Sequence, residues 1–364
     1  MTSAPGAALA SELKPDAEQA VARMAAWWEG EILDRPTLMV TAPRARRAAL
    51  PEKSHATWRE RWLDVEFVVE RAWEAARNTY YGGECLPIYH PNLGPDVMAA
   101  SLGSGLTFAE HTSWSEPFLD DWDGLNMLEF EPDHEYVRAI VAMTRHACEL
   151  GRGKWLVGIT DLHPGGDQCA ALRGAQQLCL DLVDDPERVR ALMKRLRPTF
   201  YRWYETQREI LLAAGQKLTT SWLRLFAEGR YYIPSNDFSC MIAPAVFEEF
   251  FLDEIREEVA WLDRSIYHLD GPMALRHLDA ILSIEELDAV QFVYGAGNGP
   301  ATRWIPVFQR IQVAGKNLHI SAEGGELDAL MAALRPEGVM IQIHARTPEE
   351  AESLIGKARQ WPKP

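Results

Sequence analysis

Hydrophobic residues in the second half of the chain form short runs, and longer segments with helical periodicity separate these runs. The runs are rich in valine, isoleucine, leucine and aromatic residues, which is typical of strands buried on both faces. They span residues 154–160, 265–269, 287–293, 317–321 and 339–344. The alternation predicts repeated βα units around a parallel sheet.

The helical segments carry clear start signals. A proline in the first turn marks a helix start, because that position needs no hydrogen-bond donor. Helices are predicted to begin at Pro186, Pro244, Pro300 and Pro348, and an earlier helix spans 16–30. The helix from Pro186 is predicted to run to Gly215.

Polar residues gather where several predicted strands end. They are Asp161, His268, Asp270, His319, Glu323 and His344. A (β/α)₈ barrel builds its active site from the carboxyl ends of many strands, whereas a doubly wound sheet gathers ligands at one switch point. The sequence therefore predicts an α/β fold of the (β/α)₈ TIM-like barrel type, with an N-terminal helical extension.

The composition supports one globular domain. The 364 residues include 47% hydrophobic and 25% charged residues, enough to bury a large core. No internal repeat and no long polar linker divides the chain. We predict a disordered or frayed start at 1–14 and a single domain over 15–364.

The charge balance points to small-molecule partners. A formal net charge of −16 makes a nucleic-acid or anionic-membrane surface improbable, because phosphate binding needs a basic patch. The first residues lack a secretory signal, and no apolar segment is long enough to cross a bilayer. The five cysteines are scattered without a C-x-x-C pair, which suggests reduced thiols. A cytoplasmic protein is expected.

The strongest candidate constellation joins His268, Asp270 and His344, with His319 or Glu323 as further members. In a strand, residues two apart point to the same face, so His268 and Asp270 project together. Two imidazoles and a carboxylate match catalytic zinc or non-haem iron sites. Asp270, which precedes Gly-Pro, could equally cap the turn and the helix that follow it. His344 could form a hydrogen bond with the loop that follows it.

Other positions are candidates for catalysis or substrate binding, and each has a structural alternative. Asp237 could contact substrate or satisfy loop amides. Asp161 and His163 precede a glycine pair, where a ligand could approach the backbone closely or a turn could need positive φ. Trp114 and Tyr232 are aromatic residues suited to pocket walls, although most of the tryptophans must be core.

Several segments resemble the uroporphyrinogen decarboxylase superfamily. They are G-I-T-D…A-L-R-G (158–174), N-D-F-S-C-M-I-A-P-A-V-F-E-E-F (236–250), Y-H-L-D-G (267–271) and H-A-R-T-P-E-E-A (344–351). The resemblance covers roughly residue 87 to the C-terminus. It implies a (β/α)₈ barrel, a homodimer and one of two activities.

One branch of that superfamily contains cofactor-free porphyrinogen decarboxylases. Its arginine-rich N-terminal motif is not visible here, and His90 and Asn92 stand where that branch has an aspartate, so both are candidate substrate-binding residues. His344 falls where the branch also carries a histidine. With the aspartate missing, true uroporphyrinogen decarboxylation is less favoured.

The other branch contains corrinoid-linked methyltransferases, which hold zinc through a His-x-Cys and a later cysteine. His268 matches the histidine, Asp270 replaces the first cysteine, and His344 lies near the second. This harder ligand set suits zinc, iron or manganese, or a polar substrate bound without metal. The resulting hypothesis is metal-assisted methyl transfer linked to a corrinoid protein.

Two alternatives remain open. One is a cofactor-free decarboxylase of a porphyrin-like or other carboxylated substrate, with His344 and Asp237 handling protons. The other is a non-catalytic tetrapyrrole or corrinoid binding module. The candidate catalytic residues are Asp237, His344 and Asp161, and the candidate substrate-binding residues are His90, Asn92, Trp114, His163, Tyr232, His319 and Glu323.

Overall fold

A computed structural model describes residues 13–361, and its main element is a seven-stranded sheet. The strands follow one another in the order β2 (Thr79–Gly83), β1 (Thr37–Pro43), β13 (Val339–His344), β12 (Asn317–Ser321), β11 (Ala289–Val293), β10 (Arg264–Asp270) and β9 (Tyr231–Tyr232). All neighbours are parallel except β1 and β2, which are antiparallel. The predicted α/β class with a parallel sheet is confirmed.

Three smaller sheets accompany the main one. They pair β3 (Ile88–Tyr89) with β6 (Leu156–Val157), β4 (Gly105–Phe108) with β5 (Ser113–Glu116), and β7 (Leu218–Thr220) with β8 (Phe226–Glu228). The β3–β6 pair is parallel. A backbone hydrogen bond connects two of these pieces: the Ile159 amide, just after β6, donates to the carbonyl of Thr220 on β7 (2.8 Å).

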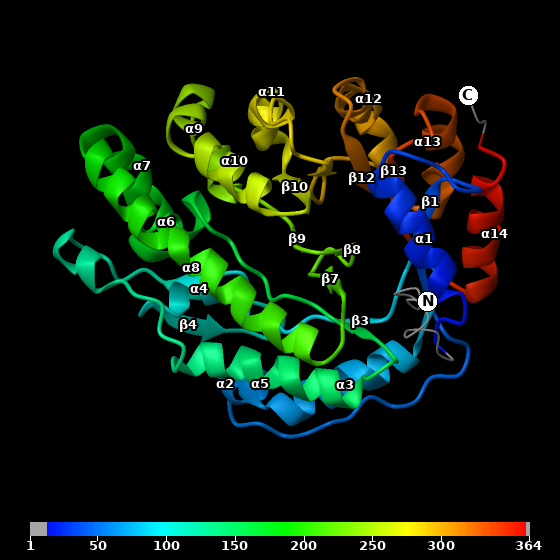
Figure 1. Ribbon diagram of the computed structural model, residues 1–364, viewed down its shortest axis with the longest axis horizontal. Coiled ribbons are helices and arrows are strands. Elements are labelled where there is room, and N and C mark those ends of the chain that lie inside the picture. Colours follow the sequence, from blue (N-terminus) through cyan, green and yellow to red (C-terminus); the bar gives the residue numbers. More distant parts are fainter. Residues whose placement is uncertain (1–12, 362–364) are drawn as a thin grey trace.

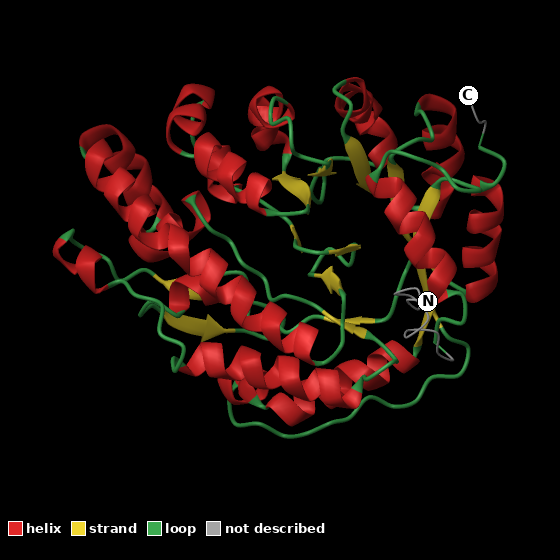
Figure 2. Cartoon of the chain, viewed as in Figure 1, coloured by secondary structure: helices red, strands yellow, loops and turns green. Residues whose placement is uncertain are grey.

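Helices lie outside the strands and surround them (Figure 1). The α-helices are α1 (Ala17–Trp28), α2 (Trp58–Leu63), α3 (Val65–Arg77), α4 (Val97–Ala100), α5 (Glu135–Leu150), α6 (Gly166–Arg173), α7 (Ala175–Asp184), α8 (Pro186–Ala213), α9 (Pro244–Phe250), α10 (Leu252–Trp261), α11 (Leu278–Leu282), α12 (Ile305–Val313), α13 (Leu327–Ala333) and α14 (Pro348–Ala358). The 3₁₀ helices are η2 (Asp123–Met127), η3 (Asp237–Met241), η4 (Pro272–His277), η5 (Ala301–Trp304) and η6 (Gly324–Glu326). Figure 2 shows that long loops join many of these elements on the side of α2 to α5.

The predicted elements of the second half are present. Strands occupy all five predicted runs, although β6 keeps only two residues of its run. The helix from Pro186 runs to Ala213 as predicted, while the helix from Pro244 is divided at Phe251 into α9 and α10. Thr347 caps α14 by accepting a hydrogen bond from the Glu350 amide, as the proline-containing start signal indicated.

The N-terminal helix α1 packs against the amino ends of the sheet strands. The Trp27 indole donates to the carbonyl of Gly338, just before β13, at 2.9 Å. Asn317, the first residue of β12, donates to the carbonyls of Trp27 (2.7 Å) and Trp28 (3.0 Å). Since α1 covers this end, the carboxyl ends of the strands are the end that remains for a site.

Residues 1–12 of the segment predicted to be frayed lie outside the described residues. Lys14, at the predicted end of that segment, is buried, and its ammonium donates to the carbonyls of Tyr81 and Gly83. All five cysteines are free thiols, as predicted. Within residues 13–361, no helix combines the length and the apolar character that a membrane crossing requires.

Candidate functional site

Polar side chains from four strand ends meet at the carboxyl end of the sheet. His90 directly follows β3, Asp161 and His163 follow β6, and Asp237 begins η3 after β9. In β10, His268 is two residues before the final residue of the strand. A bridge between Ser235 and His268 joins the segment before η3 to β10. The predicted gathering of polar residues at strand ends is therefore present for these positions.

Asp237 is the centre of this arrangement. Within residues 13–361, two groups of possible ligands each have atoms within 4.8 Å of one another: His163, Asp167 and Asp237, and Asp237, His268 and Asp270. Both groups use Asp237. Oxygen and imidazole nitrogen ligands of this kind suit zinc, iron or manganese.

The first group is held together by hydrogen bonds and ion pairs of its own. The Nε2 atom of His163 lies 2.9 Å from Asp161 Oδ1, and its Nδ1 lies 3.1 Å from Ser235 Oγ. Burial lowers the pKa of His163, but the carboxylates of Asp161 and Asp167 outweigh burial and raise that pKa well above 6.5. A protonated imidazole has no lone pair for a metal, so His163 acts here as a cation.

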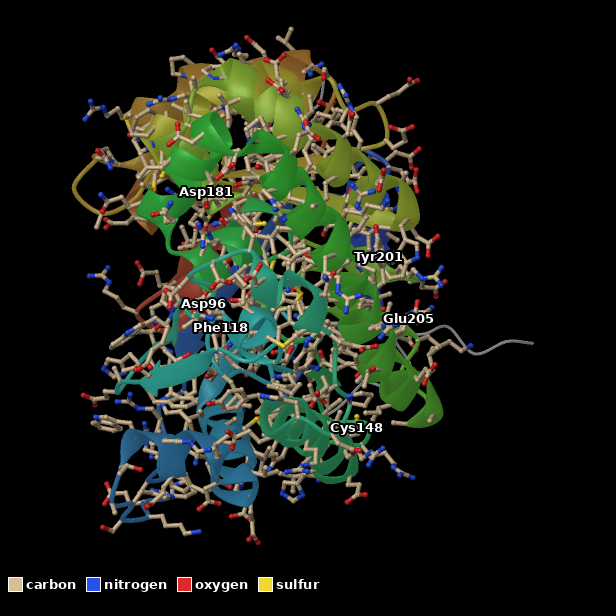
Figure 3. The ribbon with its side chains drawn as sticks, turned by 90° about the vertical axis from the view of Figure 1, so that its left-hand side faces the viewer. Asp96, Phe118, Cys148, Asp181, Tyr201 and Glu205 are labelled. Carbon is tan, nitrogen blue, oxygen red and sulfur yellow. The ribbon has the colours of Figure 1, made fainter. Side chains whose placement is uncertain are left out.

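Asp167, on the first turn of α6, positions Asp237. Its carboxylate accepts hydrogen bonds from the amides of Asp237 (3.0 Å) and Phe238 (2.7 Å). A buried ion pair between Arg173 and Asp181, with 2.7 Å between Nε and Oδ2, fixes α6 to α7 (Asp181 is labelled in Figure 3). The start of η3 is thus tied to the helix layer, and Asp237 is held at the site.

The Asp237 carboxyl group has no complete set of partners. Its Oδ1 atom is buried and has no hydrogen-bond partner within residues 13–361. Burial raises the pKa of Asp237 to about 6, and the nearby carboxylates of Asp167 and Asp270 add to this rise. A buried acceptor without a donor is costly, so the site favours a cation or a donor beside Oδ1.

His268 is oriented by the neighbouring strand. Its Nδ1 donates to Gln291 Oε1 at 2.7 Å, and the two residues are paired in the register of β10 and β11. The Trp222 ring packs edge-on against the imidazole with 5.0 Å between centroids. Because Nδ1 carries the proton, the Nε2 atom of His268 keeps a free lone pair. A hydrogen bond from the other ring nitrogen, such as the one to Gln291, usually supports a histidine that binds a metal. Asp270 is exposed at the end of the strand.

His344 and His319 lie elsewhere on the sheet. His344 ends β13, where its Nδ1 lies 3.0 Å from Thr41 Oγ1, and it lines a separate cavity of 780 Å³. Among the described residues it belongs to neither possible metal group. His319 is buried within β12, its Nε2 donates to Gln342, and burial lowers its pKa to about 4.

Two other predicted residues, Tyr232 and Glu323, make structural contacts, and a third, Trp114, is exposed. The Tyr232 hydroxyl donates to the Thr160 carbonyl (2.8 Å) and accepts from the Leu162 amide (2.6 Å), which braces the loop that carries Asp161. Glu323 caps η6 in a capping box. Trp114 lies on β5 with an exposed ring.

Sequence reasoning missed Asp167, Ser235 and Gln291. Asp167 lies four residues after His163 near a helix start, a spacing that could have suggested an interaction. Gln291 is the single polar residue between apolar neighbours in the strand A-V-Q-F-V, which is a signal for a buried contact. Ser235 gave no signal, because its role depends on the bridge to β10.

Comparison with known proteins gives a fold relationship. No protein-family model and no curated protein matches this sequence. The chain is similar in fold to a methyltransferase from Methanosarcina mazei. The TM-score is 0.61 with 11% sequence identity, and the match covers 94% of this chain and 98% of the methyltransferase. At this identity the likeness concerns the fold alone.

Two buried carboxyl groups on α10, Glu254 and Glu258, predict a pH-dependent stability. Burial raises their pKa values from an ordinary 4.5 to about 7 and about 8, respectively. The folded protein then holds protons that the unfolded chain releases, so stability should fall as pH rises from about 5 to about 8. Glu258→Gln is expected to raise the free energy of unfolding at pH 8 by on the order of 2 kcal/mol and to change it little at pH 5.

Denaturant unfolding at the two pH values tests this expectation. Asp253→Asn, at an exposed position of the same helix, is the matched control and should leave the pH dependence unchanged. An unaltered pH slope in Glu258→Gln would contradict the assignment of a raised pKa to that residue.

Proposed function

We propose that this chain is an enzyme with a closed (β/α)₈ barrel that holds a divalent metal ion with Asp237, His268 and Asp270 and transfers a methyl group. The observation that carries the proposal is the convergence of three ligand atoms within 4.8 Å, one of them from a buried carboxyl group without a full set of partners. Zinc, iron and manganese all accept such ligands. The corrinoid protein partner and the homodimer implied by the superfamily resemblance are parts of the same proposal.

Connectivity supports the closed barrel. Eight strands, β1, β3, β6, β7, β10, β11, β12 and β13, follow one another along the chain, with helices between most of them. Backbone hydrogen bonds join β3 to β6 through Tyr89 and Gly158, and β6 to β7 through Thr220 and Ile159. Between β7 and β10, β9 contacts both strands, and a β-bridge joins Ser235 to His268 on β10.

The residues present fit a metal ion. The unpartnered Oδ1 of Asp237, the available Nε2 of His268 and the Asp270 carboxylate form a harder version of a catalytic zinc site. A metal bound there would act as a Lewis acid and lower the pKa of a substrate thiol or hydroxyl. Gln291 keeps His268 in the required tautomer, Asp167 holds Asp237 in place, and the His163 cation offsets negative charge beside them.

Methyl transfer is favoured over other chemistry by the fold relationship and by the His-x-Asp at the end of β10. The test uses protein purified without a His-tag, stripped with a chelator and reconstituted with zinc, iron(II) or manganese. Methylcobalamin is the methyl donor and a panel of small thiols supplies the acceptors. Metal-dependent loss of the cobalt–methyl absorption with formation of the thioether supports the proposal; no metal binding and no transfer with any of the three ions refutes it.

A cofactor-free decarboxylase is the second candidate. The observation in its favour is the buried Asp237 carboxyl beside the His163 cation, an arrangement suited to delivering a proton to a carbanion. Release of CO₂ from a carboxylated substrate by the chelator-treated protein would favour this activity over methyl transfer.

A further inference from the structure

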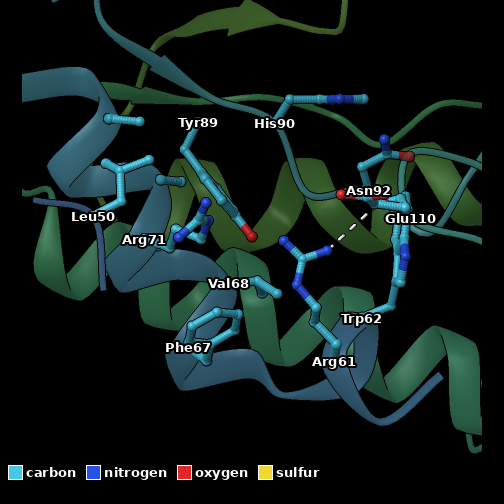
Figure 4. A pocket seen from close by; sticks show the side chains of 12 residues that line it. Leu50, Arg61, Trp62, Phe67, Val68, Arg71, Tyr89, His90, Asn92 and Glu110 are labelled. Atoms are coloured by element: carbon cyan, nitrogen blue, oxygen red, sulfur yellow. Dashed lines mark hydrogen bonds between the residues drawn. The ribbon is translucent and has the colours of Figure 1, made fainter. Parts of the chain in front are cut away.

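A cavity of about 350 Å³ lies beside the candidate site, between α2, α3 and the end of β3 (Figure 4). Its lining includes Arg61, Arg71, Trp62, Phe67, Tyr89 and His90. Figure 4 shows both guanidinium groups and the Tyr89 hydroxyl directed into this space. The volume suits a small organic molecule.

The two arginines lie in a lining that also includes one carboxylate residue, Glu110. Neither Arg61 nor Arg71 forms an ion pair with a carboxylate within residues 13–361, although the chain as a whole carries a net charge of −16. Arg71 donates to the Pro51 carbonyl (2.7 Å), and Arg61 has only a long contact of 3.4 Å with the Glu110 carbonyl. Each guanidinium has five donors, so most of them remain for a ligand.

The walls of the cavity are held in place. The Arg61 guanidinium lies over the rings of Trp58 (5.6 Å) and Phe67 (6.0 Å). Trp62 is fixed by a hydrogen bond from its indole to the Ala109 carbonyl (2.8 Å), and Tyr89 stacks on Trp155 at 5.3 Å. The cavity thus combines aromatic walls in fixed positions with the Arg61 and Arg71 guanidinium groups. A planar anionic group attached to an apolar ring would match both features.

His90 connects this cavity to the candidate site. It lines the cavity, and its buried Nε2 has no hydrogen-bond partner within the described residues. Burial lowers the pKa of His90 to about 4 against the opposing influence of Asp161, whose carboxylate is paired with His163. His90 is thus a neutral imidazole that lines the cavity and lies near Asp161 of the candidate site.

We propose that the cavity is a carboxylate subsite, in which Arg61 and Arg71 bind the carboxylate of an aromatic acid while Trp62, Phe67 and Tyr89 contact its ring. The inference rests on the proposed function in one respect: the anchored acid is the substrate whose other end reaches the site. The binding step itself needs no metal and no turnover.

Calorimetric titration of the metal-stripped full chain tests the subsite, with benzoate and its neutral counterpart benzyl alcohol as probes. Benzoate is expected to bind saturably and benzyl alcohol at least about tenfold more weakly. Arg61→Met or Arg71→Met should weaken benzoate binding at least about tenfold and leave benzyl alcohol unaffected. Arg188→Met, at an exposed position of α8, is the control and should change neither affinity.

Three results would overturn the proposal: no saturable benzoate binding, equal affinity for the two probes, or unchanged benzoate affinity in both methionine variants. Phenyl phosphate that binds more than about tenfold tighter than benzoate would replace the carboxylate with a phosphate ligand and overturn the assignment as well. If Arg61→Met loses its circular-dichroism melting transition, Arg71→Met and Arg61→Lys decide the outcome.

A metal-ligand variant separates this proposal from the proposed function. Asp237→Asn should keep its benzoate affinity, because the subsite does not use Asp237. Benzoate binding without metal-dependent turnover would support the subsite and count against methyl transfer alone. Turnover without benzoate binding would count against the subsite alone.

Discussion

His268→Ala is expected to lower the metal content of the reconstituted protein from about one ion per chain to a small fraction of that, and to reduce metal-dependent turnover about 100-fold or more. The imidazole is the single nitrogen ligand of the proposed set, and its removal leaves Asp237 and Asp270 as the only remaining ligands. Two carboxylates without a third ligand hold a divalent ion weakly at neutral pH. Elemental analysis after dialysis, combined with the methyl-transfer assay, measures both effects.

Two control variants make this result specific. His344→Ala should retain the metal, since His344 lies beside Thr41 and outside both groups of possible ligands among the described residues. Gln291→Leu removes only the partner of His268 Nδ1 and should weaken metal affinity about 10- to 100-fold. A His268→Ala protein that keeps its full metal content, or a His344→Ala protein that loses it, would show that the ligand set is different.

Arg35→Met is expected to lower the free energy of unfolding by about 3–5 kcal/mol. Arg35 and Glu84 are 2% and 0% exposed, with 2.6 Å between Nη2 and Oε1. Glu84 also accepts a hydrogen bond from the Leu38 amide (2.8 Å), so its carboxylate links the start of β1 to the residue after β2. Removing the guanidinium leaves a buried carboxylate without its main counter-charge, which is the costly case.

Chemical denaturation followed by fluorescence of the tryptophans measures this loss. Asp328→Asn is the matched control, because the Asp328–Lys357 pair is exposed and should contribute less than about 1 kcal/mol. A loss of the same small size in Arg35→Met would mean that Glu84 becomes solvated or protonated when its partner is removed.

Signals carried by neighbouring residues predicted much of the fold. Pro348 after Thr347 indicated the start of α14, and the apolar runs placed β10 to β13 to within a few residues. The break at Phe251 was missed, because the apolar pattern of α9 continues into α10 while the helix axis changes. Two of the three proposed ligands followed from the same kind of reasoning, since positions i and i+2 in β10 put His268 and Asp270 on one face.

The sequence by itself determined that the chain is an α/β protein with polar residues at strand ends, and that His268 and Asp270 lie on one face of a strand. Hydrophobic period, proline position and strand alternation are properties of adjacent residues, so they can be read before folding. Only the tertiary structure decided that Asp237 joins them and that His344 does not. That choice depends on strand register and on Asp167 holding the start of η3, which are contacts between residues far apart in the chain.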